Sequence, residues 1–260
     1  MIDYNNYTIS GNLCNIIKTL SAGYDGQGFS SAEEPEQSAG APREQWQITR
    51  DNLASINWAD SGRRAEYVRL YFERYAKLVS WWTTCYVSLD RIRPCSTIID
   101  IGCGPGSAVI GFLDSMLQRN NHEVMNNISN IHLVDKSTEV VNFAFDNIKQ
   151  LLTSFEIQKN IPIKKTVIDI NVTNDITLLK SNILFSTNMF CELNDTGKSK
   201  LKKIIKSPVS SNLSPDMFFI SDCVELVKFE NFFLNTGVGI EKIKYSTGNN
   251  ERTFVYISKN

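Results

Sequence analysis

The chain has 260 residues, of which 42% are hydrophobic and 21% charged, and this is an ordinary balance for a soluble globular protein. Such a length suffices for one large α/β domain with an additional helical segment. The formal net charge of −1 excludes a general electrostatic attraction to nucleic acid or to an anionic membrane, leaving only local patches open.

The cysteine and histidine content argues against a metal centre. No two of the six cysteines have the C-x-x-C spacing, and there are only two histidines. We therefore predict no metal site. Residues 1–20 lack a basic start followed by an apolar core, and no apolar run approaches the ~18 residues of a membrane helix. We expect a cytoplasmic protein with free thiols and no membrane contact.

Residues 1–92 are predicted to form a helical N-terminal extension. A short helix is expected over 12–20, where apolar residues recur on one side. The segment 25–43 is rich in Gly, Ser, Pro and Glu, so we expect a mobile loop that closes as a lid. A second helix is expected over 44–56, and a long one over 61–89.

Aromatic residues recur with helical period along the predicted helix 61–89. The stripe contains Tyr71, Tyr75 and Trp82. The simpler interpretation is a face that packs against the rest of the protein. The alternative is that one or two aromatic residues near the end of this helix line a substrate pocket, with Tyr71, Tyr75 and Trp82 as the candidates, because aromatic side chains combine apolar area with a polar tip.

Between residues 93 and 260, strand-like apolar runs alternate with helix-period segments, which predicts a parallel sheet covered by helices. Strands are expected over 97–101, 130–134, 163–168, 182–186 and 216–221, followed by a hairpin of 240–245 and 253–258. Helices are expected over 107–117, 137–155, 195–206 and 225–234.

The most informative stretch is Asp100-Ile101-Gly102-Cys103-Gly104-Pro105-Gly106, which lies between a predicted strand and a predicted helix. A glycine turn at this place lets the backbone approach a ligand, and the helix start adds a positive end. Further along, Ile131-His132-Leu133-Val134-Asp135 ends the second strand in an acid, which can accept both hydroxyls of a ribose. The glycine spacing differs from the G-x-G-x-x-G of dinucleotide binders.

Together these stretches resemble motif I and the following acidic position of the class I S-adenosylmethionine-dependent methyltransferases. The resemblance extends over residues 90–260 in the order of strands and helices, and it is sharp over 97–107 and 131–137. It implies a Rossmann-like α/β sandwich with a seven-stranded, mostly parallel sheet, whose antiparallel last strand lies between strands five and six. It also implies an enzyme with S-adenosyl-L-methionine as cofactor.

The resemblance further implies which residues bind this cofactor. Those near its amino-acid part would be Asp100, Gly102, Cys103, Gly104, Gly106 and Ser107. Asp135 would bind the ribose, with Lys136 and Ser137 beside the adenine. Asp169 would accept a hydrogen bond from the adenine amino group next to the Ile170 N–H, and Asn188, Met189 and Phe190 would line the site after the fourth strand. Simpler interpretations are a surface acid at Asp135 and a turn residue at Asp169.

Catalysis depends on few residues in this family, because the protein must mainly hold the methyl acceptor close and aligned. The candidate catalytic residue is Glu192, as a base or as a partner for a cationic or amine acceptor. The competing interpretation is that Glu192 begins the next helix, where an acid is favourable. The segment from Asn188 lacks the Asn-Pro-Pro-Tyr pattern of many nucleic-acid amino methyltransferases, which disfavours that reaction.

The preferred function is methyl transfer to a small molecule or short peptide in a pocket that the extension caps. One alternative is an RNA or ribosome methyltransferase, and another is a binding module that kept the fold without catalysis. An aminopropyl transferase that uses decarboxylated cofactor is disfavoured, because Asn188 stands where an acid is expected. The sequence specifies neither the acceptor nor the oligomeric state.

Overall fold

The computed structural model describes residues 2–22, 64–65, 67–119, 122–155, 160–172, 182–187, 189, 193–206, 217–221, 240–247 and 250–258. The predicted loop 25–43 and the predicted helices 44–56 and 225–234 lie outside the described residues. Among the residues described, no helix is both long and apolar enough to cross a bilayer.

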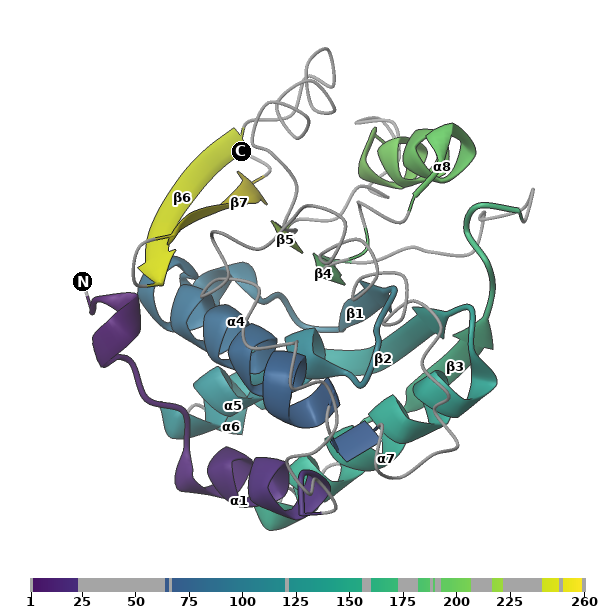
Figure 1. Ribbon diagram of the computed structural model, residues 1–260. Coiled ribbons are helices and arrows are strands. Elements are labelled where there is room, and N and C mark those ends of the chain that lie inside the picture. Colours follow the sequence, from purple (N-terminus) through teal and green to yellow (C-terminus); the bar gives the residue numbers. More distant parts are fainter. Residues whose placement is uncertain are drawn as a thin grey trace.

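A seven-stranded sheet of order β3-β2-β1-β4-β5-β7-β6 forms the centre of the fold (Figure 1). Its strands are β1 (Ser96–Ile101), β2 (Ile128–Asp135), β3 (Ile163–Val167), β4 (Ile183–Thr187), β5 (Met217–Ser221), β6 (Ile240–Thr247) and β7 (Asn250–Ser258). The first five run parallel, which confirms the prediction from alternating strands and helices. β7 pairs antiparallel with both β5 and β6 and lies between them.

Helices precede and connect the strands. They are α1 (Gly11–Leu20), α4 (Glu73–Tyr86), α5 (Ser107–Gln118), α6 (His122–Met125), α7 (Thr138–Ser154) and α8 (Asp195–Lys206). A π-helical turn, η2 (Val68–Phe72), runs directly into α4. The described part of the predicted helix 61–89 therefore changes its hydrogen-bond register, a feature that often marks functional sites.

Local chemistry sets where the helices begin. The Ser10 hydroxyl accepts a hydrogen bond from the Leu13 N–H at 3.0 Å, and the Ser137 hydroxyl accepts one from the Val140 N–H at 3.3 Å. These caps satisfy helix N–H groups that have no partner within the helix. α5 begins instead after Gly106, whose φ of +85° lies in the left-handed region that favours glycine.

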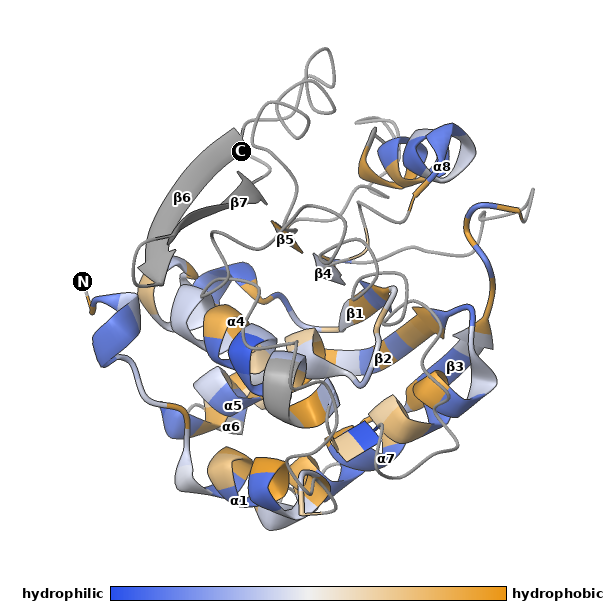
Figure 2. Ribbon diagram, viewed as in Figure 1, coloured by the Kyte–Doolittle hydropathy of each residue, from blue (hydrophilic) through white to orange (hydrophobic). Residues whose placement is uncertain are grey.

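Alternate residues of the parallel strands face two hydrophobic cores. Ile98 and Phe185 pack with α1, α4, α5 and α7, whereas Ile99 and Leu184 pack with α8. Figure 1 shows α4, α5 and α7 along one side of the sheet and α8 on the other. In Figure 2, hydrophilic and apolar residues alternate along α7 and α8, as expected for helices with one buried face.

α4 packs closely on α5 and on the sheet. A Cβ added at Gly111 would overlap the carbonyl oxygen of Ala76, so the two helices cross with their backbones nearly in contact. Trp82 has no exposed surface, and its ring centroid lies 4.9 Å from that of Phe219 in β5. α4 is therefore part of the main core.

A buried polar network holds the N-terminal segment on α4 and α5. The Asp114 carboxylate accepts hydrogen bonds from the Ser10 N–H at 3.3 Å and from the Ser10 hydroxyl. It also accepts from the Ser80 hydroxyl at 3.1 Å and from Gln118 Nε2 at 2.8 Å. Burial raises the pKa of Asp114, and these donors offset part of the rise. Tyr7 extends the network through its hydroxyl, 2.7 Å from that of Ser80.

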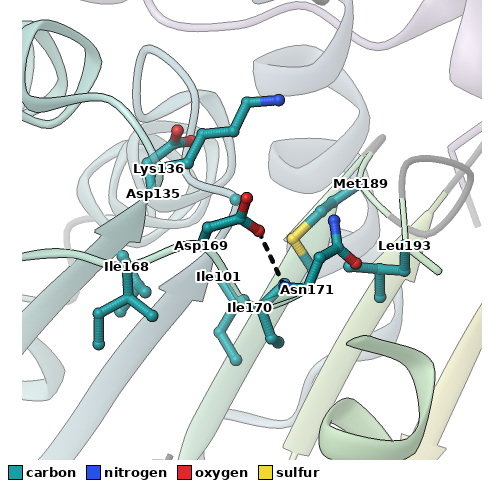
Figure 3. A pocket seen from close by; sticks show the side chains of 11 residues that line it. Ile101, Asp135, Lys136, Ile168, Asp169, Ile170, Asn171, Met189 and Leu193 are labelled. Atoms are coloured by element: carbon teal, nitrogen blue, oxygen red, sulfur yellow. Dashed lines mark hydrogen bonds between the residues drawn. The ribbon is translucent and has the colours of Figure 1, made fainter. Parts of the chain in front are cut away.

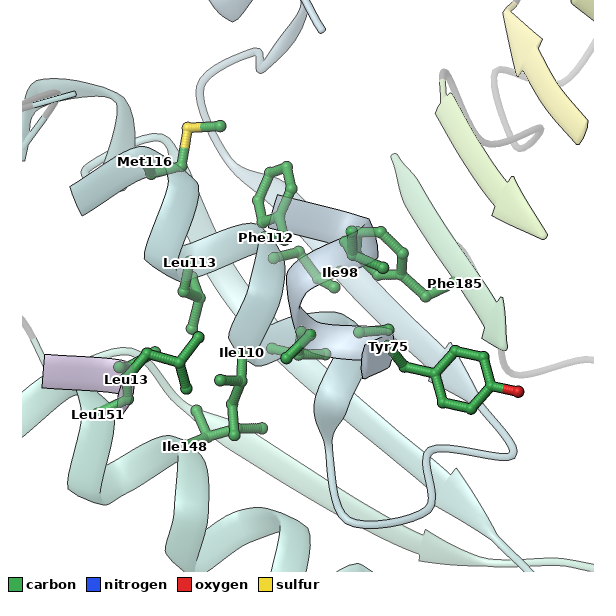
Figure 4. Packing of buried hydrophobic residues seen from close by; sticks show 14 of the residues in the cluster. Leu13, Tyr75, Ile98, Ile110, Phe112, Leu113, Met116, Ile148, Leu151 and Phe185 are labelled. Carbon is green, nitrogen blue, oxygen red and sulfur yellow. The ribbon is translucent and has the colours of Figure 1, made fainter. Parts of the chain in front are cut away.

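Apolar contacts of α1 complete this attachment. Leu13 is fully buried and lies beside Leu113 and Leu151 (Figure 4). The described part of residues 1–92 thus shares one core with the sheet and its helices. Its action as a lid stays a prediction.

Candidate functional site

A recess opens at the carboxyl ends of β1 to β4. It holds about 420 Å³, including its open mouth, and is lined by residues 101–102, 134–136 and 168–171 together with Met189 and Leu193. Figure 3 shows Asp135 and Asp169 on neighbouring strand ends, with the Met189 side chain across from them. The strand order reverses between β1 and β4, and open α/β sheets bind ligands at such a switch point.

The glycine turn, residues 102–106, forms one end of this recess. Gly102, Gly104 and Gly106 have φ values of +67°, +49° and +85°. The N–H groups of Gly102 and Cys103 donate to the carbonyl oxygen of Val134 at 2.8 and 3.1 Å, which anchors the turn to the end of β2. The turn is therefore fixed before any ligand arrives.

Met189 covers the start of the glycine turn. A Cβ on Gly102 would lie 2.5 Å from the Met189 sulfur, so only glycine leaves room for this side chain. The structure places Met189 in the recess, where the resemblance implied a cofactor contact. Asn188, Phe190 and Glu192 lie outside the described residues, so their roles stay predictions.

Asp100 is completely buried at the end of β1, and neither carboxyl oxygen has a hydrogen-bond partner among the described residues. Burial raises its pKa to about 7, and the charge of Asp135 adds to the rise. The nearby Val109 N–H offsets part of this rise in the pKa, although it is not placed to form a hydrogen bond with either carboxyl oxygen. A buried carboxyl with unfilled acceptor positions suits a cationic or hydrogen-donating ligand group.

Asp135 joins the two sequence motifs. Its Oδ2 accepts a hydrogen bond from the Gly104 N–H at 3.1 Å, 31 positions away, and its Oδ1 accepts one from the Ser137 N–H at 3.3 Å. Burial raises the Asp135 pKa, and these N–H groups oppose the rise. The acid and the glycine turn thus form one site, and the carboxylate also lines the recess.

The far wall of the recess consists of the segment after β3. Asp169 Oδ1 accepts a hydrogen bond from the Asn171 N–H at 2.9 Å, which closes a local turn. α8 and the residue before it support this wall, because the Asn194 N–H donates to Asn171 Oδ1 at 2.9 Å and Lys200 Nζ donates to the Ile170 carbonyl at 3.1 Å. Asn171 was not among the predicted site residues, although an Asn next to a predicted turn acid is a usable signal.

Of the four remaining predicted cofactor residues, one lines the recess and three do not. Lys136 lines the recess, whereas Ser107 begins α5 and Ser137 caps α7. Cys103 is buried in the turn, and burial, followed by the charges of Asp135 and Asp100, raises its thiol pKa well above the ordinary value. A neutral thiol fits the interpretation of Cys103 as a small spacer.

The aromatic stripe of η2 and α4 does not line the recess. Tyr71, Tyr75 and Trp82 are 7%, 5% and 0% exposed and belong to the main core. The Trp82 side chain is enclosed against Phe219, which supports its packing role, and its contact with substrate stays a prediction. Substrate contacts of Tyr71 and Tyr75 stay predictions, and their burial supports the packing interpretation.

The groups around the recess fit an adenosyl amino acid. Asp100 is buried next to the lining residue Ile101 and does not itself line the recess, but it offers unfilled acceptors for an ammonium. Asp135, which does line the recess, offers a carboxylate for a ribose diol. Ile168 and Ile170 supply apolar surface for a purine, with the Asp169 carboxylate beside them. The glycine turn leaves its backbone open to the amino-acid part.

No protein-family model and no curated protein matches the chain. Among solved structures, magnesium protoporphyrin IX methyltransferase (ChlM) from Synechocystis PCC 6803 with bound SAM has 14% identity and a TM-score of 0.46, over 85% of this chain and 99% of that one. Human N-acetylserotonin methyltransferase in complex with SAM has 12% identity and a TM-score of 0.48, over 84% and 62%. TrmK from M. capricolum with S-adenosyl-homocysteine has 12% identity and a TM-score of 0.42, over 73% and 67%. These TM-scores lie below 0.5, so the function is inferred from the residues of the site itself.

Proposed function

We propose that the protein is an S-adenosylmethionine-dependent methyltransferase of class I. The observation that carries the proposal is the hydrogen bond between the Gly104 N–H and the Asp135 carboxylate, which unites the glycine turn and the ribose-type acid in one recess. The antiparallel position of β7 between β5 and β6 supports it, since this placement is the one that the resemblance implies.

The residues around the recess have distinct roles in this proposal. The cofactor supplies an electrophilic methyl group on a sulfonium. Asp135 binds the ribose hydroxyls, Asp169 and the Ile170 N–H hold the adenine edge, and Asp100 attracts the ammonium. Met189 excludes water from the start of the glycine turn, where the amino-acid part lies. Glu192 serves as the general base where the acceptor must lose a proton.

The acceptor in this proposal is a small molecule or a short peptide. The support is the position of the N-terminal extension, because the hydroxyl of Tyr67 lies over the glycine turn and α4 packs directly on α5. A helix in that place limits the size of an acceptor that can reach the methyl group. The enzyme would act in the cytoplasm, and residues 25–43 would close the pocket.

The proposal predicts that Asp135→Asn lowers the affinity for S-adenosylhomocysteine by about tenfold or more, since a charge-assisted pair of hydrogen bonds to the ribose is weakened. Isothermal titration calorimetry measures this. Wild-type protein should also bind adenosine more tightly than 2′,3′-dideoxyadenosine, and Asp135→Asn should remove that difference. Equal binding of both nucleosides by the wild type would contradict the placement of the ribose.

The acceptor class is tested by methyl transfer from tritiated S-adenosylmethionine into fractions of a cell extract. We expect label in the low-molecular-weight fraction, insensitive to ribonuclease. Label in RNA, with transfer that weakens steeply as salt rises, would favour the RNA alternative instead.

A further inference from the structure

The peptide group between Ile170 and Asn171 connects the far wall of the recess to α8. Its N–H, on Asn171, donates to Asp169 Oδ1 at 2.9 Å, and this bond is the dashed line in Figure 3. Its carbonyl, on Ile170, accepts a hydrogen bond at 3.1 Å from Lys200 Nζ, 30 positions further along the chain. One planar unit is therefore bonded to a carboxylate of the recess at one end and to a lysine of α8 at the other.

The first turn of α8 is fitted to the same segment. The Asn194 N–H, just before the helix, donates to Asn171 Oδ1 at 2.9 Å, and Asn194 Oδ1 accepts from the Gly197 N–H at 2.9 Å. A Cβ on Gly197 would overlap Asn171 Oδ1, so only glycine leaves room for this contact. This close fit holds Lys200 within reach of the Ile170 carbonyl.

The charge of the lysine strengthens this series of hydrogen bonds. A hydrogen bond from an ammonium is roughly twice as strong as one between neutral groups, and hydrogen bonds in series polarise one another. An ammonium on the Ile170 carbonyl therefore makes the Asn171 N–H a better donor to Asp169. The result is a carboxylate whose Oδ1 is fixed, whereas no residue in the described part of the chain donates to its Oδ2.

A carboxylate that is fixed in this way distinguishes ligands by their donors. A side chain that is already held loses less conformational freedom when a ligand binds than one that is not. Asp169 Oδ2 can accept a hydrogen bond from an amino group, and a ligand without that group leaves it unused. A change in how firmly Asp169 is held should therefore affect only ligands with a donor at that place.

From this arrangement, and given the proposed function, in which Asp169 accepts from the adenine amino group, we infer that Lys200 is a positioning residue for adenine recognition. Lys200 does not itself line the recess. It acts through the Ile170–Asn171 peptide group and sets the preference of the site for a purine with a 6-amino group. One of the five lysines of α8 thus has a specific task in ligand selection.

The test compares Lys200→Met with wild type by calorimetry, using adenosine and purine riboside, which differ only in the 6-amino group. We expect wild-type protein to bind adenosine about tenfold more tightly than purine riboside. Lys200→Met should weaken adenosine binding about fivefold and leave purine riboside unchanged, because only adenosine uses Asp169. Lys203→Met, on the exposed surface of the same helix, is the matched control and should behave as wild type.

A double-mutant cycle connects the effect to Asp169. In an Asp169→Asn background, Lys200→Met should cause no further loss of the preference for adenosine, because the carboxylate that Lys200 positions is already gone. Lys200→Gln should reproduce the selective loss, and it replaces Lys200→Met if urea unfolding shows that the methionine variant does not fold.

The two nucleosides separate the possible failures. An equal loss for both in a folded Lys200 variant, or no loss for adenosine, overturns the inference and leaves the proposed function intact. So does a wild-type protein that binds S-adenosylhomocysteine but has no preference for adenosine over purine riboside. If wild-type protein binds neither nucleoside and no S-adenosylhomocysteine, the proposed function fails, and the role of Lys200 fails with it.

Discussion

At the scale of single residues, Asp100 carries the most unusual chemistry in the site. It is fully buried with both carboxyl oxygens unpartnered among the described residues, and the neighbouring charge is another carboxylate. A buried carboxyl normally has donors around it, since desolvation is otherwise costly. We interpret the missing partner as the ammonium of the ligand, which would let Asp100 ionise.

This interpretation predicts a pH-dependent affinity. With a pKa of about 7, Asp100 is largely protonated at pH 6 and largely ionised at pH 8, so affinity for S-adenosylhomocysteine should rise over this interval. Asp100→Asn should bind more weakly and show a flatter profile. Calorimetry in buffers of different ionisation enthalpy should detect proton release on binding to wild type alone. An equally steep profile in Asp100→Asn would contradict the assignment.

The Asp100 carboxyl affects the stability of the ligand-free protein in the opposite direction, because its contribution to the free energy of unfolding falls as the pH rises. Its folded pKa is raised above the ordinary value of 3.8, so the native state binds the proton more tightly than the unfolded chain. The resulting stabilisation is complete below about pH 4 and disappears as the pH rises through about 7. The difference in unfolding free energy between wild type and Asp100→Asn should therefore fall over that range.

At the scale of elements, the crossing of α4 and α5 depends on two small residues. Ala76 and Gly111 allow the backbones to approach so closely that no Cβ fits at Gly111. This contact fixes α4, and with it η2 and Tyr67, relative to the glycine turn at the start of α5. Packing at this crossing therefore controls the geometry of the site.

Gly111→Ala should destabilise the protein by about 2–3 kcal/mol, because the added methyl meets backbone that must shift. The loss should occur even though alanine favours helix over glycine by about 1 kcal/mol. Gly11→Ala is the matched control, since a Cβ at Gly11 has no atom within 4 Å. Urea unfolding of both variants measures the difference, and similar midpoints would contradict the close crossing.

At the scale of the whole molecule, the N-terminal segment belongs to the main core. Leu13, Ile16 and Ile17 of α1 are buried, and the Ser10 N–H donates a hydrogen bond to the Asp114 carboxylate of α5. Removing such an element exposes apolar surface and leaves a buried carboxylate with fewer donors. We expect truncation to affect stability before it affects any step at the site.

Leu13→Ala should lower the unfolding free energy by about 3 kcal/mol, the cost typical of a fully buried leucine. Leu20→Ala, in the last turn of the same helix, should cost clearly less, because Leu20 is only half-buried. Chemical denaturation checks both. Equal effects would indicate that α1 does not pack as described.

Local patterns in the sequence predict much of this fold. The range 195–206 coincides with α8, and the predicted strands overlap all seven observed strands, because apolar period and capping residues act over short distances. The Gly104–Asp135 association was likewise foreseeable, since the ends of adjacent parallel strands meet at one edge of the sheet.

Other features had no local signal. η2 escaped prediction because Val68, Tyr71, Phe72 and Tyr75 fit an ordinary α-helical period, so nothing in their spacing reveals the register change. The Asp114 network joins residues that are 104 positions apart in the sequence. An acidic residue in an otherwise apolar helix is expected to be exposed when its hydrogen-bond partners are unknown. The burial of Trp82 likewise follows from tertiary packing against Phe219.

The attachment of α1 has a consequence for biosynthesis. Asn12 Nδ2 donates a hydrogen bond to the carbonyl oxygen of Ser154, so the ribosome must add 142 residues after Asn12 before the docking surface of α1 is complete. At ordinary elongation rates this takes roughly 7 to 30 s. During that interval the apolar side of α1 has no native partner, and nascent-chain chaperones would find their binding segment there.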